Sequence, residues 1–120
     1  MNSTGRPAVG AARAAVAHDL HGRWATLLAQ AVAHRRWWLS QWPGGEAYVP
    51  GLLAQDVQEA VHALGDPLWP LCPTCRDHAL SVEPDLGPDS FWVCHRSGLP
   101  VAEVGRLPAR REQPAHGPRP

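Results

Sequence analysis

Lysine is absent from this sequence of 120 residues, and all eleven basic side chains are arginines. A Gly-rich phosphate loop that ends in Lys is therefore excluded. Isoleucine is also absent, while Ala, Pro, Gly and Arg abound, a composition typical of high-GC bacterial genomes. No Ser-His-Asp or Cys-His-Asn set can be recognised in the sequence. We therefore expect a protein that is not an enzyme.

Long apolar runs are missing too. No window approaches the roughly 18 continuous apolar residues of a membrane span. Near the start, Arg13 and the pair His18 and Asp19 interrupt the apolar stretch that a signal peptide needs. We therefore expect a cytoplasmic protein without a membrane partner. Cysteine is scarce: three residues, an odd number, fit poorly with a disulfide framework.

The formal net charge is zero, but its distribution is uneven. Residues 1–50 carry five Arg against two acids, and residues 51–65 carry two acids alone. Residues 66–106 carry six acids against three Arg, and the last fourteen residues carry three Arg against one Glu. The middle of the chain is therefore acidic and both ends are basic.

The order of the patterns predicts an α+β protein: an N-terminal helical pair, then a small zinc-ribbon-like β-hairpin, between disordered termini. Residues 1–10 and 108–120 are small, polar and Pro-rich, as disordered tails are. Residues 11–65 form the helical region, with helices expected over 11–40 and 52–64. An interior glycine, Gly22, costs about 1 kcal/mol relative to Ala, which favours a break in the first helix. Both helices share an apolar i, i+4, i+7, i+8, i+11 stripe, which is Leu20, Trp24, Leu27, Leu28 and Ala31 in the first and Leu53, Val57, Ala60, Val61 and Leu64 in the second.

Short strands are expected from the remaining apolar runs. "HALSV" at 78–82 and "FWVC" at 91–94 flank the turn cluster "EPDLGPD", which predicts a hairpin with a long loop. The run at 99–107 suggests a further strand, and "EAYV" at 46–49 another short one. The hairpin lies within residues 66–107, the segment that also contains every cysteine.

Cys72 and Cys75 form a C-x2-C pair, whose spacing lets both thiolates face one tetrahedral ion. Cys94, at the end of the second expected strand, returns beside them across the hairpin. A fourth ligand comes from His78 or from His95. We favour His78, because neighbouring side chains on a strand point to opposite faces and His95 directly follows Cys94. Sulfur ligands suit zinc or iron, and the histidine favours zinc.

At these residues the chain resembles a zinc ribbon, in which a C-x2-C turn leads through a β-hairpin to a second ligand pair. More narrowly, "LWPLCPTC" and "WVC" resemble segments of small actinobacterial proteins in which a Trp-Pro step leads into the cysteine knuckle. The resemblance implies a structural Zn²⁺ with all four positions closed. The second knuckle departs from the ribbon pattern, because Ser97 stands where its second cysteine is expected.

The stretch "RRWW", with the nearby Trp42, is the candidate partner-binding surface. Arg35, Arg36, Trp37 and Trp42 combine cations and aromatic rings, which suits protein docking or base stacking; Trp packed under Arg at a helix end is the alternative. We expect a zinc-stabilised protein-interaction module, an adaptor or accessory protein. The alternative is a nucleic-acid-binding ribbon that uses the basic N-terminal helix with Arg110 and Arg111. The acidic ribbon segment disfavours it, because duplex affinity depends mainly on neutralised phosphates.

Overall fold

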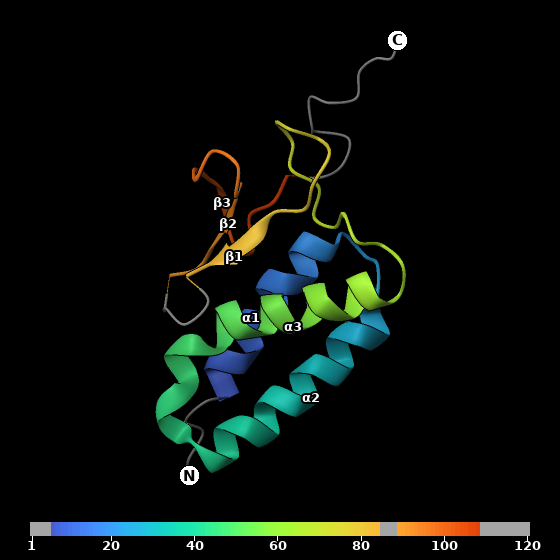
Figure 1. Ribbon diagram of the computed structural model, residues 1–120. Helices are drawn as coiled ribbons and strands as arrows, with labels where there is room; N and C mark the ends of the chain where they lie inside the picture. Colours follow the sequence, from blue (N-terminus) through green and yellow to red (C-terminus); the bar gives the residue numbers. More distant parts are fainter. Residues whose placement is uncertain (1–5, 85–88, 109–120) are drawn as a thin grey trace.

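The computed structural model describes residues 6–84 and 89–108, and Figure 1 shows their arrangement. Three α-helices and a short 3-10 helix come first: α1 (Arg6–Leu20), α2 (Ala25–Gln41), η1 (Pro43–Tyr48) and α3 (Val49–Ala63). Three strands follow: β1 (Ser81–Glu83), β2 (Phe91–Val93) and β3 (Pro100–Glu103). The expected α+β class, with helices before a small antiparallel hairpin, is confirmed.

The break expected at Gly22 is present and divides the first helical region into α1 and α2. Three residues in the connection adopt left-handed backbone angles, His21 (φ 52°), Gly22 (φ 84°) and Trp24 (φ 53°). Trp24 therefore lies in the turn rather than in the helix stripe where its spacing put it. Its half-buried ring still packs edge to face on Trp69, with the centroids 5.7 Å apart.

Three assignments in the helical region differ from expectation. The helix α1 begins at Arg6, so residues 6–10, assigned to the tail, belong to it. The strand expected at 46–49 is wrong, because these residues form the end of η1 and the start of α3. Pro50 lies in the first turn of α3, where a missing N–H costs nothing, so this helix begins at Val49 rather than at 52. Residues 1–5 and 109–120, which belong to the segments expected to be disordered, and residues 85–88, which belong to the expected turn cluster, lie outside the described residues.

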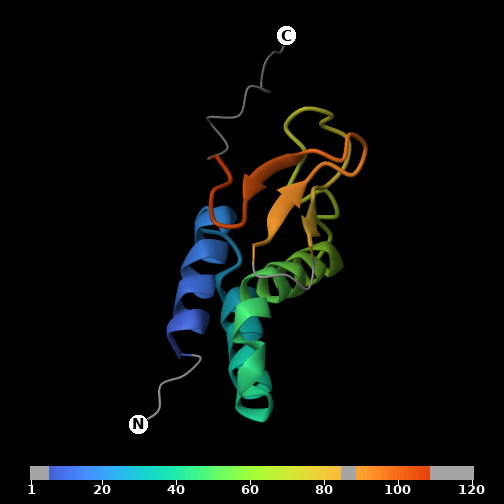
Figure 2. The ribbon, with the colours of Figure 1, turned by 90° about the vertical axis from the view of Figure 1, so that its left-hand side faces the viewer.

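The helix α3 lies at the centre of the molecule, between α1 and α2 and beneath the sheet (Figures 1 and 2). Three residues of its expected stripe, Leu53, Val57 and Val61, are fully buried, and Ala60 is partly buried. The expectation is wrong at Leu64, which follows the last residue of α3 and is 65% exposed. The part of the chain with the three strands, residues 66–84 and 89–107, is called the ribbon below. The apolar cluster of the helices continues into it and includes Leu80 and Trp92. Helices and ribbon therefore share one core.

The sheet is antiparallel in the order β1-β2-β3. Val82 lies opposite Trp92, which in turn lies opposite Ala102, and a bulge separates Trp92 from Val93. The third expected strand is present as β3, shorter than the predicted run. Before β1, a bridge between Leu71 and Ala79 closes the loop that contains the first two cysteines.

A buried carboxylate joins the first helix to the end of the sheet. Asp19, fully buried near the end of α1, accepts hydrogen bonds from the Trp92 indole (2.8 Å) and from the backbone N–H groups of Gly105 (2.6 Å) and Leu107 (2.9 Å). At Gly105 the chain passes so close to α1 that a Cβ atom would lie 2.7 Å from the Cβ of Ala15, and φ is +100°. A glycine is therefore required where the sheet exit meets α1.

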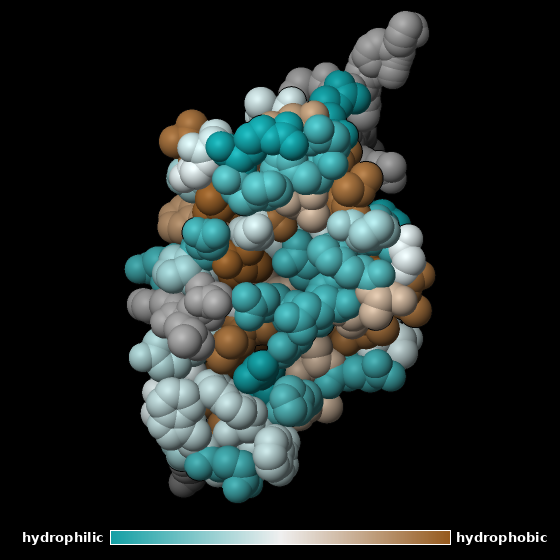
Figure 3. Space-filling view, in the orientation of Figure 1, coloured by the Kyte–Doolittle hydropathy of each residue, from teal (hydrophilic) through white to brown (hydrophobic). Residues whose placement is uncertain are grey.

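Figure 3 shows polar and apolar groups intermixed over the face that carries α3 and α2, with a paler surface over the end of α2 and η1. Within the described residues, no helix has the length and hydrophobicity that crossing a membrane would require.

Candidate metal centre

The first cysteine turn is held by its own backbone. The N–H of Cys75 donates to Cys72 Sγ (3.4 Å), and the N–H of Arg76 donates to the carbonyl of Cys72 (2.9 Å). Arg76 follows in the left-handed region, with φ of 66°. The N–H of Cys72 donates to the carbonyl of His78 (2.9 Å), which brings that histidine back beside the turn.

A second turn, at Cys94, repeats this geometry. The N–H of Gly98 donates to the carbonyl of Cys94 (2.7 Å), and Gly98 has φ of 74°. The closing bond and the left-handed residue thus match those of the first turn. Ser97 takes the place in this turn that Cys75 takes in the first. Hydrogen bonds from the Ser97 hydroxyl and backbone N–H lower the pKa of Cys94 to about 6.

The two turns and His78 bring four metal donors together. One ligand atom from each of Cys72, Cys75, His78 and Cys94 lies within 4.8 Å of all the others. Cys75 Sγ and Cys94 Sγ are 3.8 Å apart, and Cys94 Sγ is 3.7 Å from His78 Nε2. Tetrahedral zinc, with bonds of about 2.3 Å to sulfur and about 2.05 Å to nitrogen, separates such pairs by about 3.8 Å and about 3.5 Å. These two separations match those around a tetrahedral zinc ion, and the remaining donor pairs lie within 4.8 Å of each other.

His78 is oriented as a ligand, and His95 is not. The Nδ1–H of His78 donates to the carbonyl of Ala79 (2.9 Å), which leaves the Nε2 lone pair facing the sulfurs. His95 is exposed and its ring lies against that of His78, with the centroids 4.2 Å apart. The donor cluster formed by the described residues contains the favoured histidine and leaves out the alternative.

The cysteines differ in their affinity for protons. Loss of surrounding water, followed by hydrogen bonds with Cys94 and Cys72, raises the pKa of Cys75 to about 11. The lowered pKa of Cys94 makes it the ready thiolate of this pair at neutral pH. A metal ion needs deprotonated sulfur, so its binding at neutral pH releases the proton of Cys75.

The expected partner-binding residues belong to the C-terminal part of α2 and to its C-cap, Trp42, and they differ in exposure and pairing. Arg35 is bound by both carboxylate oxygens of Asp56 (2.6 and 2.9 Å), so its charge is already paired. Arg36 is exposed, and so are the side chains of Trp37 (60%) and Trp42 (48%). The Trp42 ring stacks on Tyr48 of η1. We call Arg36, Trp37, Trp42 and Tyr48 the aromatic patch.

Sequence reasoning missed two polar residues that position the ribbon. Asp19 and Gln58 are both buried on helix faces that are otherwise apolar. Gln58 donates to the carbonyls of Leu80 (2.7 Å) and Trp69 (3.3 Å), and His62 also donates to Trp69 (2.7 Å). A signal was present, because an acid at 19 and an amide at 58 fall in the same register as the buried positions around them.

A family model described as a domain of unknown function (DUF8819) matches residues 6–104, which include all four donors. No curated protein and no solved structure matches the chain.

Proposed function

Since the chain belongs to the DUF8819 family, a domain of unknown function, we propose its role from its own residues: a small protein-interaction module, an adaptor or accessory protein, whose ribbon is stabilised by one structural Zn²⁺. The observation that carries the proposal is the closed set of four protein donors, Cys72, Cys75, His78 and Cys94. Zinc bound there would cross-link the two turns and contribute folding energy to a sheet of three short strands. The set leaves no position for water, so we propose no catalytic role for the metal.

Zinc is preferred to iron because of the donor set. Three sulfurs and one imidazole nitrogen are a common structural zinc site, and the bond from His78 to the carbonyl of Ala79 gives the histidine the second contact that zinc-bound imidazoles make. A resemblance to a zinc ribbon supports the same choice. A chain that keeps its thiols reduced for a metal suits the cytoplasm, where we place it.

Protein is preferred to nucleic acid as the partner because of charge. Residues 66–106 hold six acids against three Arg, and three thiolates around one Zn²⁺ add about −1 more. In α2 the ion pair with Asp56 already neutralises Arg35. Exposed tryptophans and the exposed Arg36 are the residue types that dominate protein-protein hot spots. We therefore assign the aromatic patch as the docking surface.

Elemental analysis of the purified protein, with a His78→Ala and a His95→Ala variant, tests the metal site. We expect one zinc per chain in the wild type and in His95→Ala, and a loss of most of the zinc in His78→Ala. The control removes an imidazole that lies against the His78 ring but is not itself one of the four donors. Equal zinc in both variants, or iron in the wild type, would contradict the proposed site.

The docking surface is tested separately, by capture of partners on the immobilised protein. The double variant Trp37→Ala, Trp42→Ala should lose a protein that the wild type retains, while keeping its zinc and its circular dichroism. Leu99→Ala is the matched control, because that side chain is as exposed (65%) but lies between the second cysteine turn and β3. A capture pattern unchanged by the double variant would contradict docking through the aromatic patch.

A further inference from the structure

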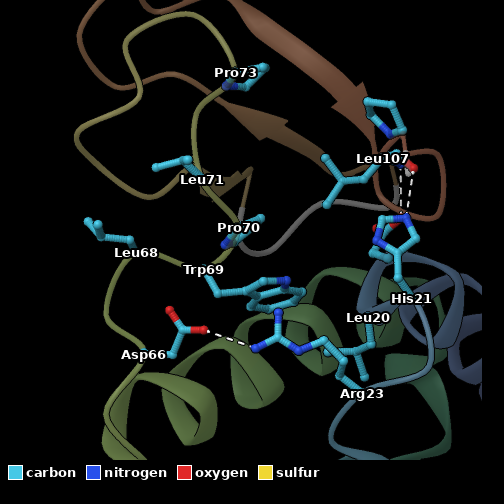
Figure 4. Close-up of a pocket in the computed structure, with 12 residues that line it drawn as sticks. Leu20, His21, Arg23, Asp66, Leu68, Trp69, Pro70, Leu71, Pro73 and Leu107 are labelled. Carbon is cyan, nitrogen blue, oxygen red and sulfur yellow. Dashed lines mark hydrogen bonds and ion pairs between the residues drawn. The ribbon is translucent and has the colours of Figure 1, made fainter. Parts of the chain in front are cut away.

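A pocket lies where three parts of the chain converge, away from the aromatic patch. One wall comes from the connection between α1 and α2, another from the segment between α3 and the first cysteine turn, and the third from the residues after β3 (Figure 4). Its volume is about 350 Å³, which falls in the usual range of ligand pockets, roughly 300–1,000 Å³. We call it the Trp69 pocket.

The surface of the Trp69 pocket is mostly aromatic and aliphatic. Trp69 supplies its indole ring, which is fixed edge to face between Trp24 and Trp92 (centroids 5.7 and 5.6 Å away). Figure 4 shows the remaining apolar side chains around it, which are Leu20, Leu68, Pro70, Leu71, Pro73 and Leu107. A rigid indole among prolines and leucines is the kind of surface that binds extended, proline-containing peptides.

The polar edge of the pocket carries one accessible anion. Asp66 meets Arg23 in a long contact of 3.4 Å, and both side chains remain well exposed (39% and 48%). An exposed pair of this kind contributes at most about 1 kcal/mol, so an incoming cation can compete for the carboxylate. The other acid of the lining, Asp19, is fully buried and already accepts four hydrogen bonds. The fitting ligand therefore combines proline with a positive charge.

The chain itself contains such a ligand. We infer that the Trp69 pocket binds the protein's own C-terminal segment, residues 109–120, "ARREQPAHGPRP". This segment starts at the pocket, because the preceding residue, Pro108, belongs to its lining. It carries three arginines against one Glu, a charge that complements Asp66, the accessible acid of the pocket lining. Prolines at 114, 118 and 120 match the apolar surface.

Because residues 109–120 are covalently attached next to the pocket, a weak contact is enough for them to occupy it. Twelve residues span up to about 37 Å at roughly 3.1 Å per residue, more than enough to fold back over a pocket that begins at residue 108. A short flexible linker holds such a segment at an effective concentration in the millimolar range. The pocket also includes Pro73, inside the first cysteine turn, so its shape depends on the metal centre. The inference is independent of the proposed docking surface, which lies at the other end of α2.

The test is an NMR comparison of full-length zinc-loaded protein with the variant Arg110→Glu, Arg111→Glu. We expect the Trp69 indole N–H and the backbone amides of Leu68 and Leu71 to shift in this variant. The matched control, Arg13→Glu with Arg36→Glu, reverses two exposed arginines elsewhere and should leave these resonances in place. Zinc content and circular dichroism of the same samples show that the fold is retained and check the metal site independently.

A synthetic peptide of residues 109–120 completes the test. It should move the shifted resonances of the variant back toward their wild-type positions, and should bind at least tenfold more weakly when Asp66→Asn is added. The wild type should not respond, because its pocket is filled. Identical pocket resonances in the wild type and the tail variant would overturn the inference. An equal response of both proteins to the peptide would overturn it as well. So would a difference between wild type and variant that vanishes on dilution, because the pocket would then be filled by the tail of a second copy of the protein.

Discussion

Ser97 is the residue that distinguishes this ribbon from a site with four sulfurs. Its turn has the same closing hydrogen bond and the same left-handed exit as the turn of Cys72 and Cys75, so position 97 corresponds to a ligand position. The hydroxyl instead bonds to Cys94 and stabilises its thiolate. The fourth donor comes from His78, which follows the first turn.

This correspondence predicts a rescue. Replacing His78 with Ala should remove most of the bound zinc, and adding Ser97→Cys should restore it, because the new sulfur would complete a second C-x2-C pair. Zinc per chain, measured after removal of loosely bound metal, tests this. The matched control is His78→Ala with Thr74→Cys, which adds a thiol at an exposed position of the first turn. Rescue by both cysteines, or by neither, would contradict the equivalence of the two turns.

The Ser97 hydroxyl also predicts a pH dependence of zinc affinity. Its hydrogen bonds lower the pKa of Cys94 from the ordinary value of 9.0 to about 6, so the wild-type sulfur is ionised throughout the neutral range. In Ser97→Ala the pKa rises, and protons compete with zinc. We expect about tenfold weaker binding near pH 7, a loss that second-contact variants commonly show. The difference should shrink as pH rises toward 9 and the variant's thiol ionises too.

Competition with a chromogenic chelator between pH 6 and 9 measures this difference. Ser97→Thr keeps the hydroxyl and serves as the control, with affinity close to that of the wild type. A ratio of affinities that is constant across the pH range would show that the hydroxyl acts on the metal site in some other way than through the protonation of Cys94.

At the scale of the elements, α1 is joined to the ribbon through Asp19. Both carboxylate oxygens accept N–H groups, Oδ2 from Trp92 and Gly105 and Oδ1 from Leu107. In Asp19→Asn an NH₂ group replaces one of the two carboxylate oxygens. In either orientation of the amide, this NH₂ would point at backbone or indole N–H groups, which cannot accept a hydrogen bond. We expect a loss of about 2–4 kcal/mol in the free energy of unfolding, because a buried donor is left without its charged acceptor.

Urea denaturation followed by tryptophan fluorescence measures the effect. Asp77→Asn makes the same chemical change at an acid that is 60% exposed, and should cost less than about 1 kcal/mol. Comparable losses in the two variants would indicate that burial of Asp19 contributes nothing particular to the contact between α1 and the ribbon.

Periodicity predicted the helices better than it predicted their connections. The buried face of α3 could be predicted because Leu53, Val57 and Val61 recur at helical spacing. At 46–49 the pattern failed, since four residues are too few to separate a strand from the turn that leads into a helix. Trp24 fitted the stripe of α2 by spacing alone, while its left-handed backbone placed it in the turn.

The metal donors were predictable from spacing, and their supports were not. The pair Cys72 and Cys75 with a returning Cys94 marked the site, and strand alternation favoured His78 over His95. The hydrogen bonds of Asp19 and Gln58 to the ribbon join residues far apart in the chain, and they depend on how the helices pack against the sheet. A single sequence gives no measure of that packing.

At the scale of the whole molecule, the metal centre and the helices share one core. Cys72 and Cys94 belong to the same apolar cluster as Val16 of α1 and Leu53 of α3. Chelation should therefore destabilise the helices as well as the ribbon, in one transition. We expect the midpoint of thermal unfolding, followed by the helical circular dichroism signal, to fall by more than about 10 °C, since roughly 2 kcal/mol is enough for such a shift in a domain of this size.

Re-addition of zinc should restore the original midpoint, and His95→Ala should respond to the chelator as the wild type does. A helical signal that melts at the same temperature with and without metal would contradict a shared core. It would divide the chain into a helical unit that is stable by itself and a ribbon attached to it.

The contacts of Asp19 also concern the order in which the chain is made. The carboxylate receives the N–H groups of residues 86 and 88 positions further along the chain. During synthesis on the ribosome, α1 emerges before the ribbon, so the Asp19 carboxylate has to wait for donors that are translated 86 and 88 residues later. Until then the apolar face of α1 cannot pack against the ribbon. We therefore expect a protease to cut nascent chains within α1 when synthesis is stalled before Leu107, and to leave chains that include Leu107 intact.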